Sequence, residues 1–106
     1  MPDQFHVHPN PGRNRRVVPF VLVVQSNRFR GSGRRAVVPL VAVEAFGLAD
    51  SAVGPHFEVD DRAVALDPLQ ITNVPRDVLG APVGSLAAED TRIINAMDAL
   101  LSCAWR

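Results

Sequence analysis

The sequence predicts a mainly β protein that ends in one helix, and two observations carry this prediction. Short apolar runs, rich in Val and Leu, follow one another over residues 5–83 and are separated by Pro, Gly and Asp. Several short strands at such close spacing are typical of a small barrel or sandwich. After about residue 87 the apolar residues change to a helical period. Because 106 residues suffice for one modest core, we expect residues 1–106 to form a single domain.

Three strands are expected in the first part of the chain: Gln4–His8, Val17–Gln25 and Arg34–Val43. The first alternates between apolar and polar residues, with His6 and His8 on one face, which is typical of a half-buried strand. The second is nearly all apolar, as expected for a strand covered on both faces, and Pro19 implies an edge or a bulge at its start. The third repeats the apolar pattern around Pro39.

The middle of the chain predicts a connection followed by a hairpin. Glu44–Pro55 is rich in small residues and weakly helical at best, so it is interpreted as a connection. His56–Leu66 reads as two short strands around Asp60 and Asp61, a pair suited to a tight two-residue turn. Gln70–Val83 holds short extended pieces interrupted by Pro and Gly.

The C-terminal part predicts a helix from about Ala87 to Trp105. Glu89 and Asp90 lie in its expected first turn, where carboxylates interact favourably with the positive end of the helix dipole. A continuous apolar stripe follows at helical spacing, formed by Ile93, Met97, Leu100, Leu101 and Ala104. We therefore expect a β barrel that this helix closes or flanks.

Charge is segregated along a chain whose formal net charge is zero. Residues 1–35 carry seven arginines against one acid, and residues 36–106 carry four against ten. Such asymmetry favours a partner chosen partly by electrostatics. The densest cationic segment lies between the apolar runs at Val21 and Leu40 and contains Arg28, Arg30, Arg34 and Arg35.

Two interpretations of this basic loop stay open. It forms either a surface for phosphates or an acidic peptide, or a solvated hairpin loop that only keeps the protein soluble. Base stacking has little support because Phe29 is the one aromatic residue in the loop. An exposed Phe29 between Arg28 and Arg30 fits a protein partner better. Trp105 has two interpretations as well, either a cover for the core or an interface anchor beside Arg106.

Site chemistry of other kinds finds little support. His6, His8 and His56 lack a nearby carboxylate or cysteine pair at metal-ligand spacing, so we expect surface histidines, no metal and no cofactor. Cys103 has no obvious histidine partner, and no glycine loop precedes a helix as phosphate binding requires.

No apolar run reaches bilayer length and no signal peptide is visible. A single cysteine fits a reducing compartment, so a cytoplasmic protein is expected.

Several short motifs, in order and at matching spacing, resemble the CcdB toxins of type II toxin–antitoxin modules. The resemblance runs from Gln4 to about Leu101. It rests on Gln4-Phe5 and Val7, Val24-Gln25-Ser26, Gly33-Arg34-Arg35, Val38-Pro39-Leu40, Val74-Pro75, and Ile93 with Asn95-Ala96.

The resemblance implies an SH3-like β barrel of the CcdB/MazF type with a C-terminal helix. It also implies a cytoplasmic homodimer that is not an enzyme. Such a toxin binds the A subunit of DNA gyrase and poisons it. A cognate CcdA-like antitoxin neutralises the toxin, and the pair represses its own operon, so that DNA is contacted only through the complex.

Positions that carry the family's activity differ here. The well-studied toxins end in Trp-Gly-Ile, whereas an ungapped alignment places Ser102, Cys103 and Ala104 there, followed by Trp105 and Arg106. Likewise, Arg28-Phe29 stands where the family has two isoleucines, and Asp98 stands where it has Asn. The expected gyrase-binding residues are Arg28, Phe29, Asp98, Leu101, Ser102 and Trp105, and the expected antitoxin-binding residues are Arg30, Arg34 and Arg35.

Two other functions are compatible with this sequence. One is a MazF-type endoribonuclease, in which Arg34 or Arg35 stabilises the transition-state phosphate, although no general base is evident beside them. The other is a CcdB relative that keeps dimerisation and antitoxin binding but poisons nothing.

Overall fold

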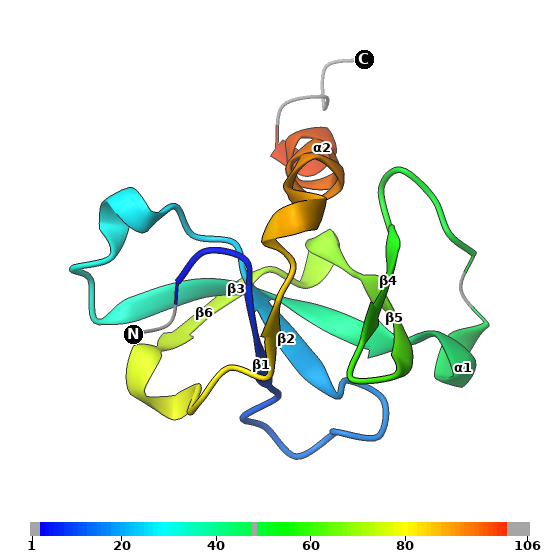
Figure 1. The fold of residues 1–106 in the computed structure, drawn as a ribbon, viewed down its shortest axis with the longest axis horizontal. Helices are drawn as coiled ribbons and strands as arrows, with labels where there is room; N and C mark the ends of the chain where they lie inside the picture. The colour runs from blue at the N-terminus through cyan, green and yellow to red at the C-terminus, as the bar shows by residue number, and fades with distance from the viewer. Residues whose placement is uncertain (1–2, 48, 102–106) are drawn as a thin grey trace.

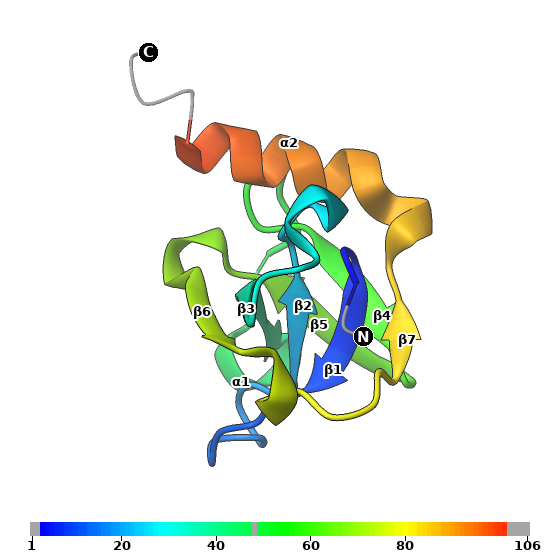
Figure 2. The ribbon, with the colours of Figure 1, turned by 90° about the vertical axis from the view of Figure 1, so that its left-hand side faces the viewer.

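The computed structural model describes residues 3–47 and 49–101, which form an antiparallel, nearly closed barrel with a helix across one end (Figures 1 and 2). The strands are β1 His6–Pro9, β2 Phe20–Val23, β3 Arg34–Ala42, β4 His56–Val59, β5 Arg62–Leu66, β6 Thr72–Pro75 and β7 Gly84–Ser85. The helices are α1 Val43–Phe46 and α2 Asp90–Leu101, with 3-10 turns η1 Asn27–Phe29, η2 Pro68–Gln70, η3 Arg76–Val78 and η4 Ala87–Glu89. This architecture confirms the predicted fold class.

β3 is the central strand of the sheet, whose order is β4-β5-β3-β2-β1-β7, with β6 also on β3. One edge of β3 pairs with β2, and the other pairs first with β6 and then with β5. Pro39 lies between these two partners, after the pair Val37–Thr72 and before Leu40–Leu66. The carbonyl of Pro39 accepts a hydrogen bond from the N–H of Asp67 at 3.1 Å. The nitrogen of Pro39 faces the same edge of β3, in the gap between β6 and β5, so the absence of its N–H costs no hydrogen bond of the sheet.

β2 is buried on both faces, as predicted. The side chains of Phe20 and Leu22 point into the main core, and those of Val21 and Val23 point into a smaller core on the outer face. The main core lies between the sheet and α2 and contains Val7, Phe20, Leu22, Val38, Leu40, Phe57, Val59, Val64, Leu66, Leu86, Ile93 and Ala96. The smaller core contains Val21, Val23, Val37 and Leu79.

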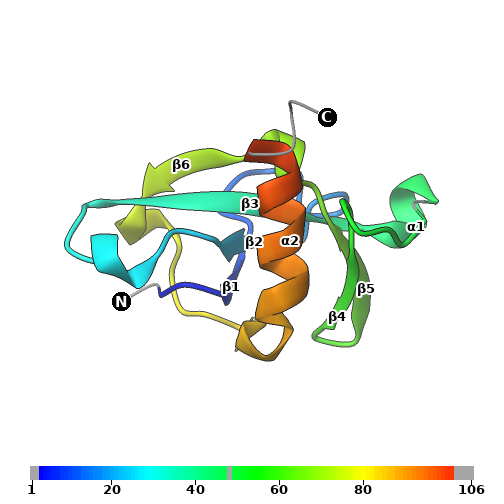
Figure 3. The same cartoon turned by 90° about the horizontal axis from the view of Figure 1, so that it is seen from above.

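α2 crosses the end of the barrel (Figure 3), and this placement corrects the predicted apolar stripe. Ile93 and Ala96 are buried and Met97 is half-buried against the core, but Leu101 is 69% exposed. Leu101 lies with Ile94 and Asp98 on the outer face of the helix, away from Ile93, so its i+8 spacing from Ile93 does not bring it to the buried side. Ala104, the last predicted member of the stripe, lies outside the described residues.

The remaining elements follow the sequence closely. The connection after β3 begins with one helical turn, α1, which Gly47 ends in the left-handed conformation at φ 60°. The predicted hairpin is confirmed as β4 and β5, with Val59 paired to Arg62. Asp60 and Asp61 form the two-residue turn at φ 53° and 62°, values that belong to a type I′ turn. No helix in residues 3–47 and 49–101 has the length and apolar character to cross a membrane.

The hairpin turn predicts a stabilising substitution. Asp61→Gly should raise the free energy of unfolding by ~0.5–1 kcal/mol, because glycine adopts positive φ without the penalty of a Cβ atom. Thermal unfolding should show a higher Tm by about 2–6 °C. Asp67→Gly is the matched control, since Asp67 has a negative φ of −119° and should lose stability. An unchanged or lower Tm for Asp61→Gly would contradict the turn geometry.

Candidate partner-binding site

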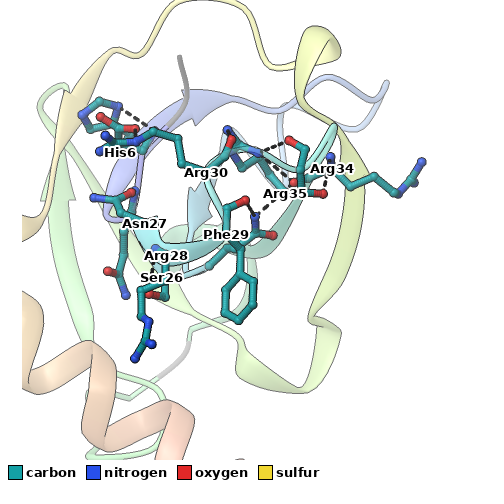
Figure 4. A network of polar contacts seen from close by, with 12 residues as sticks. His6, Ser26, Asn27, Arg28, Phe29, Arg30, Arg34 and Arg35 are labelled. Carbon is teal, nitrogen blue, oxygen red and sulfur yellow. Dashed lines mark hydrogen bonds and ion pairs between the residues drawn. The ribbon is translucent and has the colours of Figure 1, made fainter.

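The segment from Gln25 to Arg35 forms an ordered loop between β2 and β3, and its first turn is held by side chains (Figure 4). Ser26 begins η1, and its Oγ accepts a hydrogen bond from the N–H of Arg28 at 3.2 Å. The Oδ1 atom of Asn27 accepts from the N–H of Gln4 at 2.9 Å, which ties the loop to the N-terminal segment. These contacts fix the backbone from which Arg28 and Phe29 project.

Gln25 connects the two ends of the loop. Its Nε2 donates to the carbonyls of Phe29 and Arg34, both at 3.2 Å, and its Oε1 accepts from the N–H of Ala36 at 2.9 Å. One side chain therefore satisfies three backbone groups that no strand pairs. Gln25 entered the sequence prediction only as part of a family motif, because an amide next to a turn does not reveal this role by itself.

Arg35 fills the inside of the loop, where it is 2% exposed. Its Nη1 donates to the carbonyls of Ser32 at 2.7 Å and Arg34 at 2.9 Å, and its Nη2 donates to that of Arg30 at 2.9 Å. The fork-shaped guanidinium bridges backbone acceptors that point inward, as a lysine could not. Arg35 thus supports the loop from within, which corrects its expected placement on an antitoxin-binding or phosphate-stabilising surface.

The other predicted loop residues are exposed. Phe29 is 64% exposed and, with Arg28, projects from the side of the loop opposite Arg35 (Figure 4). Arg30 forms an ion pair with Asp3 at 3.0 Å. Arg34 donates to the side-chain and backbone oxygens of Asn73. An aromatic ring in water with a cation on either side has the composition of an interface anchor.

The outer face of α2 supplies a second exposed surface. Ile94, Asp98 and Leu101 share this face at helical spacing, and Ile94 and Leu101 are 44% and 69% exposed. Asp98 and Leu101 were predicted as contacts, whereas Ile94 was missed although its i, i+4 and i+7 spacing to them could have identified it. Ser102 and Trp105, also predicted, lie outside the described residues.

The two exposed surfaces share one end of the molecule. η1 and α2 both lie at the upper end in Figures 1 and 2, and the view from above places η1 to one side of the helix (Figure 3). The fold therefore presents the loop and the helix in a common direction without packing one against the other.

An apolar cavity of about 500 Å³ opens beneath the last turns of α2. It is lined by Ala96, Ala99 and Leu100 of the helix together with Val53, Leu66 and Leu69, and Leu69 is 80% exposed at its edge. No sequence pattern indicates this cavity, because the alanines that line it from α2 are ordinary helix formers.

The histidines differ from the expectation of a solvent-facing pair. His8 is fully buried in the part of the fold covered by Leu79 and Gly80, although its ring centroid lies 6.2 Å from that of the partly exposed His6. Burial lowers the pKa of His8, and main-chain groups of Leu79 and Gly80 oppose this shift more weakly. Among residues 3–47 and 49–101, no group of three His, Cys, Asp or Glu side chains has metal-site geometry.

Comparisons with known proteins agree with the fold. A family model described as "CcdB protein" matches residues 4–103 of this chain, nearly its whole length. A search of the curated proteins found no match.

Gln25→Ala should loosen the loop without removing any surface contact. The amide of Ala36 loses its acceptor, so its hydrogen exchange should accelerate by roughly 5-fold or more, as expected for the loss of about 1 kcal/mol. Amide exchange followed by NMR measures this directly, with Leu22 in β2 as the internal reference. The control Gln70→Ala removes an amide that bonds only Asp67 in another turn. Equal exchange at Ala36 in all three proteins would refute the role of Gln25.

The buried His8 predicts a dependence of stability on pH. Its folded pKa lies below the ordinary 6.5, so the unfolded chain binds the proton first, and stability falls as the pH drops below that value. The Tm should therefore decrease between pH 7.5 and pH 5, and His8→Gln should flatten this decrease. The control His6→Gln should keep most of it. The interpretation fails if His8→Gln retains the full slope.

Proposed function

Since this chain belongs to the CcdB family, whose members are toxins that act by binding and not as enzymes, we propose that it binds the A subunit of DNA gyrase and poisons the enzyme. The observation that carries this proposal is the hydrogen-bonded loop that presents Phe29 beside Arg28. The match to the family over residues 4–103 supports the toxin role, and the loop supplies the contact.

The chemistry of the loop suits a protein target. Phe29 offers apolar area that loses water on binding, and Arg28 offers a cation for registering against an acidic or carbonyl-rich surface. The loop is already held by Gln25, Ser26 and Arg35, so little ordering entropy is lost when a target binds. We expect most of the affinity for gyrase to come from Phe29, an aromatic anchor that the loop already holds in place.

The helix completes the proposed target-binding face. Ile94, Asp98 and Leu101 lie on the exposed side of α2, and the chain continues from Leu101 to Ser102 and Trp105. We include Ser102 and Trp105 in this face as proposed contacts. In a homodimer, two copies of the loop and helix would give the target a symmetric surface.

The antitoxin is proposed to use the neighbouring cations. Arg30 and Arg34 are exposed beside the anchor, and each is held by one neighbour, Asp3 or Asn73. An acidic segment of a cognate CcdA-like antitoxin can replace these contacts with charge-assisted bonds and cover Phe29 at the same time. Neutralisation then follows from occupation of the target-binding face, and the toxin–antitoxin complex is proposed to repress its own operon.

Phe29→Ala tests the proposal in cells and with purified gyrase A subunit. Truncating a central anchor costs ~2 kcal/mol or more, so the dissociation constant should rise roughly 30-fold and growth arrest on induction should be lost. Val78→Ala, which truncates another exposed apolar side chain in η3, is the matched control and should remain toxic. Trp105→Ala should also abolish toxicity while the dimer stays folded.

The alternatives predict other outcomes. Growth arrest that persists in a strain whose gyrase evades binding, with RNA fragments accumulating, would replace the proposal with a MazF-type ribonuclease. Absence of any arrest by the unmodified chain would indicate a relative that keeps only dimerisation and antitoxin binding.

A further inference from the structure

The loop between β1 and β2 is a second cationic surface, distinct from the proposed target-binding face. Every residue from Pro11 to Arg16 is exposed, and three of these six are arginines, Arg13, Arg15 and Arg16. The loop lies at the end of the barrel opposite α2 (Figures 1 and 2). Nothing in the proposed binding of gyrase or antitoxin uses it.

The backbone of this loop is braced around Asn10. The Oδ1 atom of Asn10 accepts from the N–H of Gly12 at 2.9 Å, and its Nδ2 donates to the carbonyl of Val18 at 2.9 Å. The carbonyl of Asn10 accepts from the Nε of Arg15 at 2.7 Å, and the N–H of Val18 donates to the carbonyl of Asn14 at 2.9 Å. The arginines therefore project from a defined turn.

The charges of this loop are not neutralised within the described residues. No described carboxylate forms an ion pair with Arg13, Arg15 or Arg16, whereas Arg30, Arg62 and Arg92 each pair with at least one acid. Acids do occur at the same end of the sheet. Glu44 is paired with Arg62, and the two aspartates of the β4–β5 turn are exposed. Three guanidinium groups within four residues thus have no described carboxylate partner, and the Nη atoms of Arg15 stay available to an external anion beside its Nε bond to Asn10.

The composition of the loop selects the kind of anion. Residues 10–16 contain no large apolar or aromatic side chain, so the loop lacks both the anchor of a protein interface and the stacking platform for single-stranded bases. Forked guanidinium groups suit the phosphates of a duplex, where neighbouring charges follow one another along the backbone. We propose that this loop contacts the phosphate backbone of double-stranded DNA directly. This interaction goes beyond the proposed binding of gyrase and antitoxin, and it departs from the expectation that DNA is contacted only through the toxin–antitoxin complex.

The test measures binding of the full chain to a fluorescein-labelled DNA duplex of arbitrary sequence by fluorescence anisotropy. At physiological salt we expect a dissociation constant of roughly 1–100 µM, as for sequence-independent binding. Arg13→Gln/Arg15→Gln/Arg16→Gln should weaken binding roughly 10-fold or more. It should also lower the slope of log Kd against log salt by about 2–3, because each phosphate contact contributes about 0.9.

The matched control removes the same charge from the other end of the molecule. Arg28→Gln/Arg30→Gln/Arg34→Gln should change duplex binding by less than about 2-fold, since these residues lie in the β2–β3 loop. An equal loss in both variants would show a net-charge effect and overturn the proposal, as would unchanged binding of the first variant. Tighter binding of single-stranded DNA or of an RNA duplex than of the DNA duplex would overturn the assigned ligand.

A cell assay separates this inference from the proposed function. The Arg13, Arg15 and Arg16 variant should still arrest growth if gyrase is bound through the opposite end of the molecule. Loss of duplex binding with toxicity intact supports both proposals. Intact duplex binding together with lost toxicity contradicts the assignment of this loop to DNA. In that case the Phe29→Ala variant still tests the gyrase proposal.

Discussion

The constraint on which the rest of the structure depends is the sharing of β3 between three partners. Its first half pairs with β6, its last residues pair with β5, and β2 pairs with its other edge over residues 37–40. Pro39 marks the change of partner because it has no N–H to leave unpaired. Both exposed ends of the barrel follow from this arrangement, since the loop before β3 and the loop before β2 leave the sheet in opposite directions.

Much of the fold was predictable because its elements carry local signals. The buried strand at Val21, the turn at Asp60-Asp61 and the start of α2 near Asp90 each follow from side-chain pattern or turn chemistry. The end of the apolar stripe was wrongly predicted, because Leu101 shares the outer face of α2 with Ile94 and lies away from the buried Ile93. His8 was misassigned for a tertiary reason, since residues distant in sequence, around Leu79, cover it.

The candidate site was predictable in location and only partly in mechanism. Counting charges located the basic loop and identified Phe29 as its exposed aromatic residue. A count of charges does not indicate where each side chain points, however. It could not show that Arg35 points into the loop while Arg28 points outward. The distinction depends on which carbonyls turn into the loop, and that is fixed only when Gln25 and β3 are in place.

The division of labour within the β2–β3 loop has a consequence for how such a protein can change its target. Gln25, Ser26 and Arg35 hold the backbone, whereas Arg28 and Phe29 carry no described side-chain bond of their own. The proposed recognition of the target and the folding of the loop thus depend on separate positions. Two exposed side chains can be exchanged to suit a different surface while the scaffold that displays them stays the same, so the loop is a natural starting point for redirecting this toxin to a new binding partner.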